Sequence, residues 1–190
     1  MKPKVYIDGK DGTTGLQIYD RLAARDDIDL LLIDEDKRKD PAARKQLMAA
    51  ADIVFLCLPD AAAIEAVALA EGTNARIIDA STAHRTAPGW VYGFPELRPG
   101  QREAIAKAKY VANPGCHATG FISIAAPLVQ AGLLPADADL ACFSLTGYSG
   151  GGKKMIAQYE GADRAEVLSS PGIYGLGQDH KHLPEMQTIC

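Results

Sequence analysis

The chain has 190 residues, a formal net charge of −4 at pH 7 and a sequence pI of about 5.5. Hydrophobic residues make up 47% and charged residues 23%, as in soluble globular proteins, which excludes a largely disordered chain. No basic excess exists to hold a phosphate backbone, and no apolar run is long enough to cross a bilayer, so we expect neither a nucleic acid nor a membrane partner. The length fits one domain or one domain plus part of another.

The first part of the chain alternates short apolar runs with stretches of helical spacing. Such alternation predicts an α/β fold with a doubly wound parallel sheet of the Rossmann type. Strands are expected at 5–7, 30–33, 53–58, 76–79 and 110–112, and helices at 15–22, from 40 onward and at 61–71.

The character changes after residue 113. A helix is expected at 119–131, a strand at 139–146, a glycine-rich loop at 147–154, weak helical structure at 155–170 and a loop at 171–185. The chain then stops at 187–190 in an apolar stretch typical of a strand that is just beginning. We therefore divide the chain into a first domain, 1–112, and part of an α+β domain, 113–190.

A glycine-rich loop directly follows the first strand. Its glycines are Gly9, Gly12 and Gly15, with Thr13 and Thr14 between the last two. Glycines at such a strand-to-helix turn let a pyrophosphate reach the N–H groups of the helix N-terminus. The loop therefore predicts a dinucleotide-binding domain.

The end of the second strand holds charges of both signs. Asp34 stands where an acidic residue would bind the ribose 2′-hydroxyl of NAD. Lys37 and Arg38 could instead bind the 2′-phosphate of NADP. The residues alone leave this choice open.

Cys116 is the candidate nucleophile. It follows Asn113-Pro114-Gly115 at the start of a helix, and a helix N-terminus favours the thiolate over the thiol. Cys57 and Cys142 fall within expected strands, where buried structural cysteines are usual. The four cysteines, which include Cys190, have no paired spacing, which favours a reducing, cytoplasmic setting.

His180, His182 and Glu185 form a second group of reactive side chains. Either histidine could serve as general acid or base, with Glu185 to orient it or to hold substrate. Two histidines are too few for a tetrahedral metal site, so no metal is expected. His84 and His117 are interpreted as loop or packing residues.

Two further segments could hold anionic groups. The loop that contains Ser149, Gly150 and Lys153 offers backbone N–H groups and ammonium groups to a phosphate or carboxylate. Ser81 and Arg85 follow a parallel strand at the edge where such sheets bind ligands. Ser81 would lie near the cofactor, and Arg85 could pair with a substrate carboxylate.

Six of these segments occur in an order that resembles N-acetyl-gamma-glutamyl-phosphate reductase of arginine biosynthesis, in the shorter of its two subfamilies. They are the Gly9–Gly15 loop, the segment ending in Arg85, Tyr92-Gly93-Phe94-Pro95-Glu96-Leu97, Asn113-Pro114-Gly115-Cys116, the loop with Ser149, and His180-Lys181-His182-Leu183-Pro184-Glu185. The resemblance covers nearly the whole chain. Aspartate-semialdehyde dehydrogenase shares the fold and the thiol chemistry but lacks counterparts of the third and sixth segments.

The resemblance implies an enzyme that reduces an acyl phosphate to an aldehyde with NADPH. Cys116 would form a thioester, and His180 would be the catalytic histidine, with His182 as the second choice. Ser149, Gly150 and Lys153 would lie near substrate or phosphate. The family's preference for NADP would make Lys37 and Arg38 the residues that bind its 2′-phosphate. A homo-oligomer is also expected. His117 departs from the family, which commonly has an aromatic residue after the cysteine.

Two alternatives stay open at this point. One is another semialdehyde dehydrogenase of the same fold, acting on aspartate semialdehyde. The other is a dinucleotide-binding module without turnover, because relatives continue beyond the equivalent of Cys190. From that ending we also expect a truncated chain with an open sheet edge and reduced stability.

Overall fold

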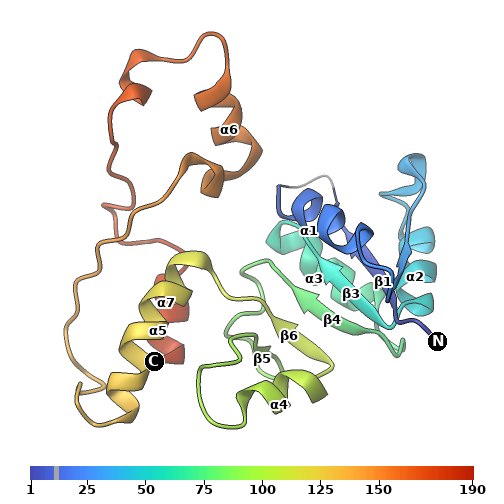
Figure 1. Ribbon diagram of the computed structural model, residues 1–190, viewed down its shortest axis with the longest axis horizontal. Coiled ribbons are helices and arrows are strands. Elements are labelled where there is room, and N and C mark those ends of the chain that lie inside the picture. Colours follow the sequence, from blue (N-terminus) through green and yellow to red (C-terminus); the bar gives the residue numbers. More distant parts are fainter. Residues whose placement is uncertain (11–12) are drawn as a thin grey trace.

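The computed structural model describes residues 1–10 and 13–190; the side chains of 13, 14 and 16 are not described. Its centre is a parallel sheet with the strand order β2-β1-β3-β4-β6-β5 (Figure 1). The strands are β1 Lys4–Asp8, β2 Asp29–Leu31, β3 Ile53–Leu56, β4 Arg76–Asp79, β5 Val91–Tyr92 and β6 Tyr110–Ala112. All pairings are parallel, which confirms the predicted fold class.

The crossover helices follow from this strand order. They are α1 Thr13–Ala23, α2 Pro41–Ala50, α3 Asp60–Leu69 and α4 Gln101–Lys107, with a short 3₁₀ helix η1 at Glu35–Lys37. The chain reverses direction across the sheet after β2, so right-handed crossovers place α1 on one face and α2 with α3 on the other. An ion pair between Arg44 of α2 and Glu65 of α3 agrees with that placement.

The start of α2 shows how local sequence sets an element. The Asp40 carboxylate accepts a hydrogen bond from the backbone N–H of Ala42, and Pro41 occupies the first helical turn. Both residues favour a helix start, because the carboxylate satisfies an N–H that lacks an intrahelical partner and proline has none to satisfy.

The main core lies between β1, β3, β4 and the helices α2 and α3. Its fully buried members include Tyr6, Met48, Val54, Leu56 and Ile77. Burial of each large apolar side chain contributes roughly 1.5–3 kcal/mol. In β3 and β4 every second residue is buried and the residues between are half-buried, whereas the edge strand β2, with Leu32 after it exposed, is less buried than its uniformly apolar run predicts.

The second part of the chain packs on the first through two helices, α5 Cys116–Gln130 and α7 Leu183–Ile189. Ala118, Ile122 and Ala126 of α5 form a small core with Met186 of α7. Tyr92 and Leu97 from the first part join the same core. The two parts therefore share one apolar cluster beside β5.

The segment between these helices leaves the rest of the molecule. It holds η2 Tyr148–Gly151, α6 Gly152–Glu160 and η3 Glu166–Ser169, and Figure 1 shows α6 well apart from α5 and the sheet. The strand predicted at 139–146 is wrong: these residues form neither helix nor bridge until the chain reaches η2. Its side chains Leu140, Phe143 and Leu145 are exposed, because no strand within residues 1–10 and 13–190 pairs with the segment.

Two other expectations are corrected. The strand predicted to begin at 187–190 is instead the end of α7, so no open sheet edge forms there. Met186, Ile189 and Cys190 have helical spacing, and all three contact the small core. The structure also adds β5 and α4, which the sequence patterns did not indicate.

No helix in the described part of the chain is both long and apolar enough to span a bilayer.

Candidate active site

The candidate active site lies where the parallel strands end. Asp8 ends β1, Asp79 ends β4, and Asn113 directly follows β6. Cys116 begins α5 a few residues later, and Cys57 directly follows β3. Because the carboxyl ends of parallel strands share one sheet edge, these residues gather at the edge where such sheets bind ligands.

The predicted dinucleotide loop folds tightly against the end of β3. Gly9 has φ +89°, and a Cβ there would lie 2.5 Å from the backbone oxygen of Cys57. A Cβ on Gly15 would lie 2.3 Å from the backbone oxygen of Gly9. Both positions therefore require glycine for the loop to close. Gly12 and the side chains of Thr13 and Thr14 lie outside the described residues.

A buried ion pair fixes the strand that leads into this loop. The guanidinium of Arg44 donates from Nε and Nη2 to Oδ2 of Asp8, at 3.1 and 2.9 Å. Both side chains are nearly inaccessible, with exposed fractions of 8% and 5%. Asp8 directly precedes Gly9, so α2 fixes the start of the glycine loop through this contact.

The charges after β2 are exposed and paired with one another. Lys37 lies 3.0 Å from Asp34, and Arg38 lies 2.9 Å from Glu35. Lys10 of the glycine loop also approaches Glu35, at 3.8 Å. The structure thus brings the β2 end beside the glycine loop, with cations and carboxylates in the same place. Nicotinamide dinucleotides fit this arrangement, since the glycine turn, the helix N-terminus and exposed cations adjoin.

Asp79 organises the loop that contains Ser81. Its carboxylate is fully buried and accepts hydrogen bonds from the Ser81 hydroxyl (2.6 Å) and the Ser81 N–H (2.9 Å). It also lies 2.6 Å from Nδ1 of His84, whose ring stacks on Trp90. His84 is therefore a packing residue, and Ser81 is held beside the end of β4 at the sheet edge.

The four cysteines have different surroundings. Cys116 is exposed at the first position of α5, after the N-cap residue Gly115. Burial raises the pKa of the Cys57 thiol to about 11, and burial also raises the pKa of Cys190. Cys142 is exposed and outside any strand, so the expectation of a buried structural cysteine is wrong for it. Cys116 alone among the cysteines combines exposure with a helix N-terminus.

Glu185 is the most connected side chain beside Cys116. It is 2% exposed, and its Oε1 accepts from the Tyr92 hydroxyl (2.6 Å) and the Gly115 N–H (2.8 Å). Its Oε2 accepts from Nη1 of Arg85 at 3.0 Å. Arg85 also donates to the backbone oxygens of Asn113 and Ala80. The carboxylate of Glu185 and the guanidinium of Arg85, both predicted to hold substrate, therefore bind each other. Both also bind the backbone of residues 113–116, called the Cys116 turn below.

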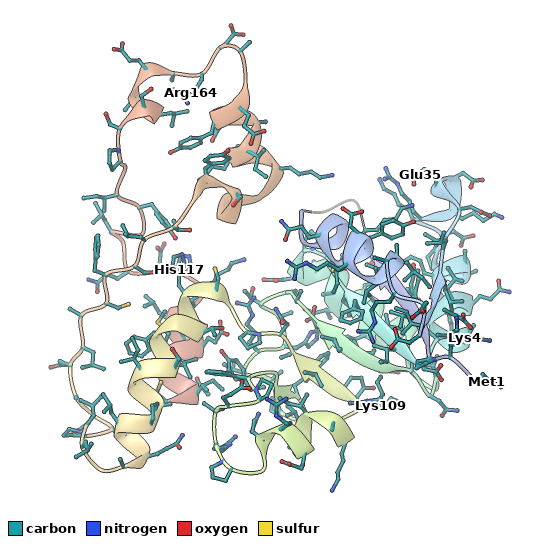
Figure 2. The ribbon with its side chains drawn as sticks, viewed as in Figure 1. Met1, Lys4, Glu35, Lys109, His117 and Arg164 are labelled. Carbon is teal, nitrogen blue, oxygen red and sulfur yellow. The ribbon has the colours of Figure 1, made fainter. Side chains whose placement is uncertain are left out.

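Three histidines surround the N-terminal end of α5. The rings of His180 and His182 lie 4.6 Å apart, and His117 lies 6.0 and 5.9 Å from them (Figure 2 labels His117). His117 contacts the hydroxyls of Ser144 and Tyr174, so it joins the predicted histidine group instead of packing alone. Within the described residues, no cluster of His, Cys, Asp or Glu is arranged to hold a metal ion.

His182 is buried against the Cys116 turn. A Cβ on Gly115 would lie 2.4 Å from its Nε2, and its Nδ1 has no hydrogen-bond partner among the described residues. Burial, and next the positive charge of Arg85, lower the pKa of His182 to about 4. His180 is half-buried, and its Nδ1 accepts from the His182 N–H at 3.2 Å. Both predicted histidines are thus close to the Cys116 turn, in different surroundings.

The predicted anion loop is not brought to Cys116. Ser149 and Gly150 lie in η2 and Lys153 lies in α6, and all three are exposed. They belong to the segment between α5 and α7, called the excursion here, whose helix α6 lies apart from α5 in Figure 1. In the described residues α6 packs mainly on η2, and the excursion reaches the Cys116 region through Ser144 and Tyr174, which contact His117, and not through this loop. The assignment of these three residues stays a prediction.

Sequence reasoning missed the structural roles of Tyr92 and Asp79. The sequence motif that begins with Tyr92 indicated a family resemblance but no role for this residue. In the structure its hydroxyl donates a hydrogen bond to Glu185, 93 positions away in sequence. Asp79 ends the strand that precedes Ser81 and Arg85. A carboxylate at the end of an apolar strand is the sequence feature that could have indicated its role in holding that loop.

Comparisons with known proteins agree with the site. Residues 33–108 match the family model of the semialdehyde dehydrogenase NAD binding domain, and residues 116–190 match that of the semialdehyde dehydrogenase dimerisation domain. The first match confirms the expectation of a nicotinamide dinucleotide cofactor.

Among curated relatives, the N-acetyl-gamma-glutamyl-phosphate reductase of Brucella anthropi is 55% identical over 98% of this chain and 61% of its own length. That of Trichormus variabilis is 52% identical over 97% of this chain and 59% of its own length. The chain thus spans about three fifths of these relatives.

Among solved structures, aspartate semialdehyde dehydrogenase II from Vibrio cholerae aligns with a TM-score of 0.68 at 15% identity, over all of this chain and 66% of its own. Aspartate semialdehyde dehydrogenase from Francisella tularensis aligns with a TM-score of 0.59 at 19% identity, over 84% of this chain and 48% of its own. At these identities the two alignments show a shared fold. By the two domain matches, which together span most of its length, the chain belongs to the semialdehyde dehydrogenase family, and its more than half-identical relatives in that family are named N-acetyl-gamma-glutamyl-phosphate reductases.

Proposed function

We propose that this chain carries the cofactor site and the nucleophile of an NADPH-dependent N-acetyl-gamma-glutamyl-phosphate reductase of arginine biosynthesis. The observation that carries the proposal is the position of Cys116. It is exposed at the first residue of α5 and lies at the same sheet edge as the glycine loop. The names of the relatives supply the substrate, N-acetyl-gamma-glutamyl phosphate.

The cofactor would lie over the glycine loop between α1 and the end of β2. Gly9 and Gly15 keep this turn free of side chains, and the N-terminus of α1 suits a pyrophosphate. Lys37 and Arg38 are exposed enough to turn toward a 2′-phosphate, and Ser81, whose hydroxyl is held by Asp79, would lie near the cofactor. When bound, the dinucleotide supplies the hydride for the reduction.

Cys116 would act first, as a nucleophile. Its thiolate attacks the acyl carbon, the bond to phosphate oxygen breaks, and phosphate leaves with the electron pair, so the acyl group stays on Cys116 as a thioester. After reduction of the thioester carbon, the C–S bond breaks and the aldehyde leaves. Covalent catalysis thereby divides one difficult reduction into two easier steps.

Charge that develops on the acyl oxygen needs hydrogen-bond donors. The N–H of Cys116 at the start of α5 is one, since N–H groups in the first helical turn lack intrahelical partners. A histidine is the other: it takes the proton of the Cys116 thiol before the attack and gives it back to the sulfur when the C–S bond breaks. His180 remains our first choice for this acid–base role and His182 the second. The pKa of His182, lowered to about 4, makes it a weak base at pH 7, which favours the more accessible His180.

Substrate contacts complete the proposal. Arg85 and Glu185 lie beside the Cys116 turn, and Arg85 retains N–H groups beyond the three that its protein acceptors use. Ser149, Gly150 and Lys153 would bind phosphate or substrate once their loop lies over this edge. We also propose a homo-oligomer in the cytoplasm, with residues 113–190 as part of the substrate domain, which the match to a dimerisation domain supports.

An assay in the oxidative direction tests the proposal. N-acetylglutamate semialdehyde, phosphate and NADP should yield NADPH with the unaltered protein, and Cys116→Ser should abolish the reaction. Cys142→Ser is the matched control, because it changes an exposed cysteine away from the helix and should retain activity. Equal activity of the two variants, or a preference for aspartate semialdehyde, would contradict the proposal. Tight NADP binding without turnover would favour a module that only binds the dinucleotide.

The same assay tests the cofactor assignment. Replacing both Lys37 and Arg38 with alanine should raise the KM for NADP about tenfold or more while leaving the KM for NAD nearly unchanged, because each contact to a phosphate is charge-assisted. An equal change for both cofactors would argue against a 2′-phosphate site at these residues.

A further inference from the structure

We propose that Tyr92 is a positioning residue for the Cys116 nucleophile and acts through the carboxylate of Glu185. The inference rests on the proposed function in one respect, that Cys116 is the nucleophile. It gives a role to Tyr92, the first residue of the Tyr92–Leu97 segment. Tyr92 belongs neither to the proposed cofactor site nor to the groups that take part in the proposed reaction.

The geometry starts from the buried carboxylate of Glu185. Its Oε1 binds the hydroxyl of Tyr92 and the N–H of Gly115 at the same time, at 2.6 and 2.8 Å. One oxygen thus connects β5 to the N-cap of α5. The other oxygen is held by Arg85, so both ends of the carboxylate are fixed.

Tyr92 is itself rigidly placed. Its ring is 4% exposed and packs in the small core with Ala118 and Met186. Its carbonyl oxygen accepts a hydrogen bond from Nε2 of Gln101 at 2.5 Å. The next residue, Gly93, lies so close to the β6 backbone that a Cβ there would be 2.9 Å from the oxygen of Ala112. The hydroxyl of Tyr92 therefore presents its proton to Glu185 from a fixed point.

Burial and the adjacent Glu185 raise the pKa of Tyr92 well above its usual range. Tyr92 consequently remains protonated, and therefore a hydrogen-bond donor, at neutral pH. Its contact with Glu185 is charge-assisted, which places it among the stronger hydrogen bonds in proteins.

The contact matters because Gly115 is the residue before Cys116. Gly115 is the N-cap of α5, with φ −72° and ψ 145°, and no side chain caps this helix. Its N–H therefore depends on Glu185 for a partner. If Tyr92 no longer held Oε1, the carboxylate could turn toward Arg85, and the Gly115–Cys116 peptide would lose its fixed orientation. The thiolate of Cys116 would then be less well stabilised by the helix N-terminus.

The test measures the reactivity of Cys116 directly, without turnover. Iodoacetamide alkylation is followed by peptide mass spectrometry as a function of pH in the intact protein, with the exposed Cys142 as the internal reference. Tyr92→Phe should slow alkylation of Cys116 at neutral pH about tenfold relative to Cys142, the scale of one charge-assisted hydrogen bond. It should also raise the pH midpoint of the Cys116 reaction.

Tyr110→Phe is the matched control. Tyr110 lies on the neighbouring strand β6, is partly buried against Trp90, and its hydroxyl has no hydrogen-bond partner within the described residues. This variant should keep both the rate and the midpoint of Cys116. Glu185→Gln, which keeps the shape of the side chain but removes its charge, should change Cys116 in the same direction as Tyr92→Phe.

A purely structural role for Tyr92 would give a different result. Tyr92→Phe would then lower the urea midpoint while the alkylation profile of Cys116 stayed unchanged, and that outcome overturns the proposal. The same holds if Tyr92→Phe does not fold and Glu185→Gln leaves Cys116 unchanged. Slow alkylation of Cys116 and absent turnover in the unaltered protein would instead contradict the proposed function, while the comparison between variants still reports on positioning.

Discussion

Replacing Gly115 with alanine should disturb the centre of the site, although the backbone there is unstrained. Gly115 has φ −72°, which any residue adopts, so conformation alone does not require glycine. The obstacle is space: a Cβ would lie 2.4 Å from Nε2 of His182 and 2.5 Å from Nη1 of Arg85. Neither neighbour can move freely, because Arg85 binds three protein acceptors and His182 is buried.

The magnitude follows from two effects. Adding a methyl group to a closely packed site typically costs about 1–3 kcal/mol. Alanine is also a poorer N-cap than glycine, which adds roughly 0.5–1 kcal/mol. We therefore expect Gly115→Ala to lower the free energy of unfolding by about 2–3 kcal/mol and to slow alkylation of Cys116.

Gly120 provides a control on the same helix. It is exposed, and nothing lies within 4 Å of a Cβ placed there. Glycine inside a helix costs about 0.5–1 kcal/mol relative to alanine, so Gly120→Ala should stabilise the protein by that amount. Urea denaturation measures both variants. If Gly115→Ala proved as stable as Gly120→Ala, with Cys116 alkylated at the unaltered rate, the close packing of the Cys116 turn would be refuted.

Two further predictions concern charged groups. Arg44→Ala leaves the buried Asp8 carboxylate without its guanidinium and should cost about 3–5 kcal/mol in urea denaturation. Arg102→Ala, which breaks an exposed pair with Glu96, should cost less than about 1 kcal/mol, and similar losses for both would contradict a buried pair. The pKa of His182 is lowered to about 4 by burial and next by Arg85, so between about pH 6.5 and pH 4 the unfolded chain binds a proton that the folded chain does not. Stability should therefore fall as the pH is lowered through that window, and it should fall less in His182→Gln; parallel curves for the two proteins would show that His182 does not titrate in this way.

Local patterns were sufficient for most of the sheet. The strands predicted at 76–79 and 110–112 have those bounds in the structure, and Asp40 with Pro41 marked the start of α2. These features depend on a residue's own neighbours in sequence. A short apolar run that alternates along the chain with helical stretches is typical of a strand in a parallel sheet.

The errors share a different cause. A strand at 139–146 needs a partner strand, and its alternating residues do not say whether one is in reach. At 187–190 the short apolar run is typical of a strand. The residues that contact the small core are instead Met186, Ile189 and Cys190, which have helical spacing. Phe143 and Leu145 are apolar, so the sequence indicated that they are buried, but both are exposed in the structure.

The role of Glu185 could not have been derived from local patterns. Its three donors, Tyr92, Gly115 and Arg85, are separated from it by 93, 70 and 100 positions in sequence. The sequence predicted a carboxylate near the histidines and an arginine near the sheet edge. Only the folded chain pairs them, because α7 packs on α5 and places Glu185 beneath the Cys116 turn.

The surroundings of the cysteines explain how one thiol out of four can be selected for covalent chemistry. Burial raises the pKa of Cys57 and Cys190, which keeps those thiols protonated and unreactive near neutral pH. Cys142 is exposed but has no helix N-terminus beside it. Cys116 has both, and its helix start is fixed by a carboxylate that arrives from α7. The proposed nucleophile therefore depends on contacts from β5 and α7, and a change far from Cys116 in sequence should alter its reactivity without touching it.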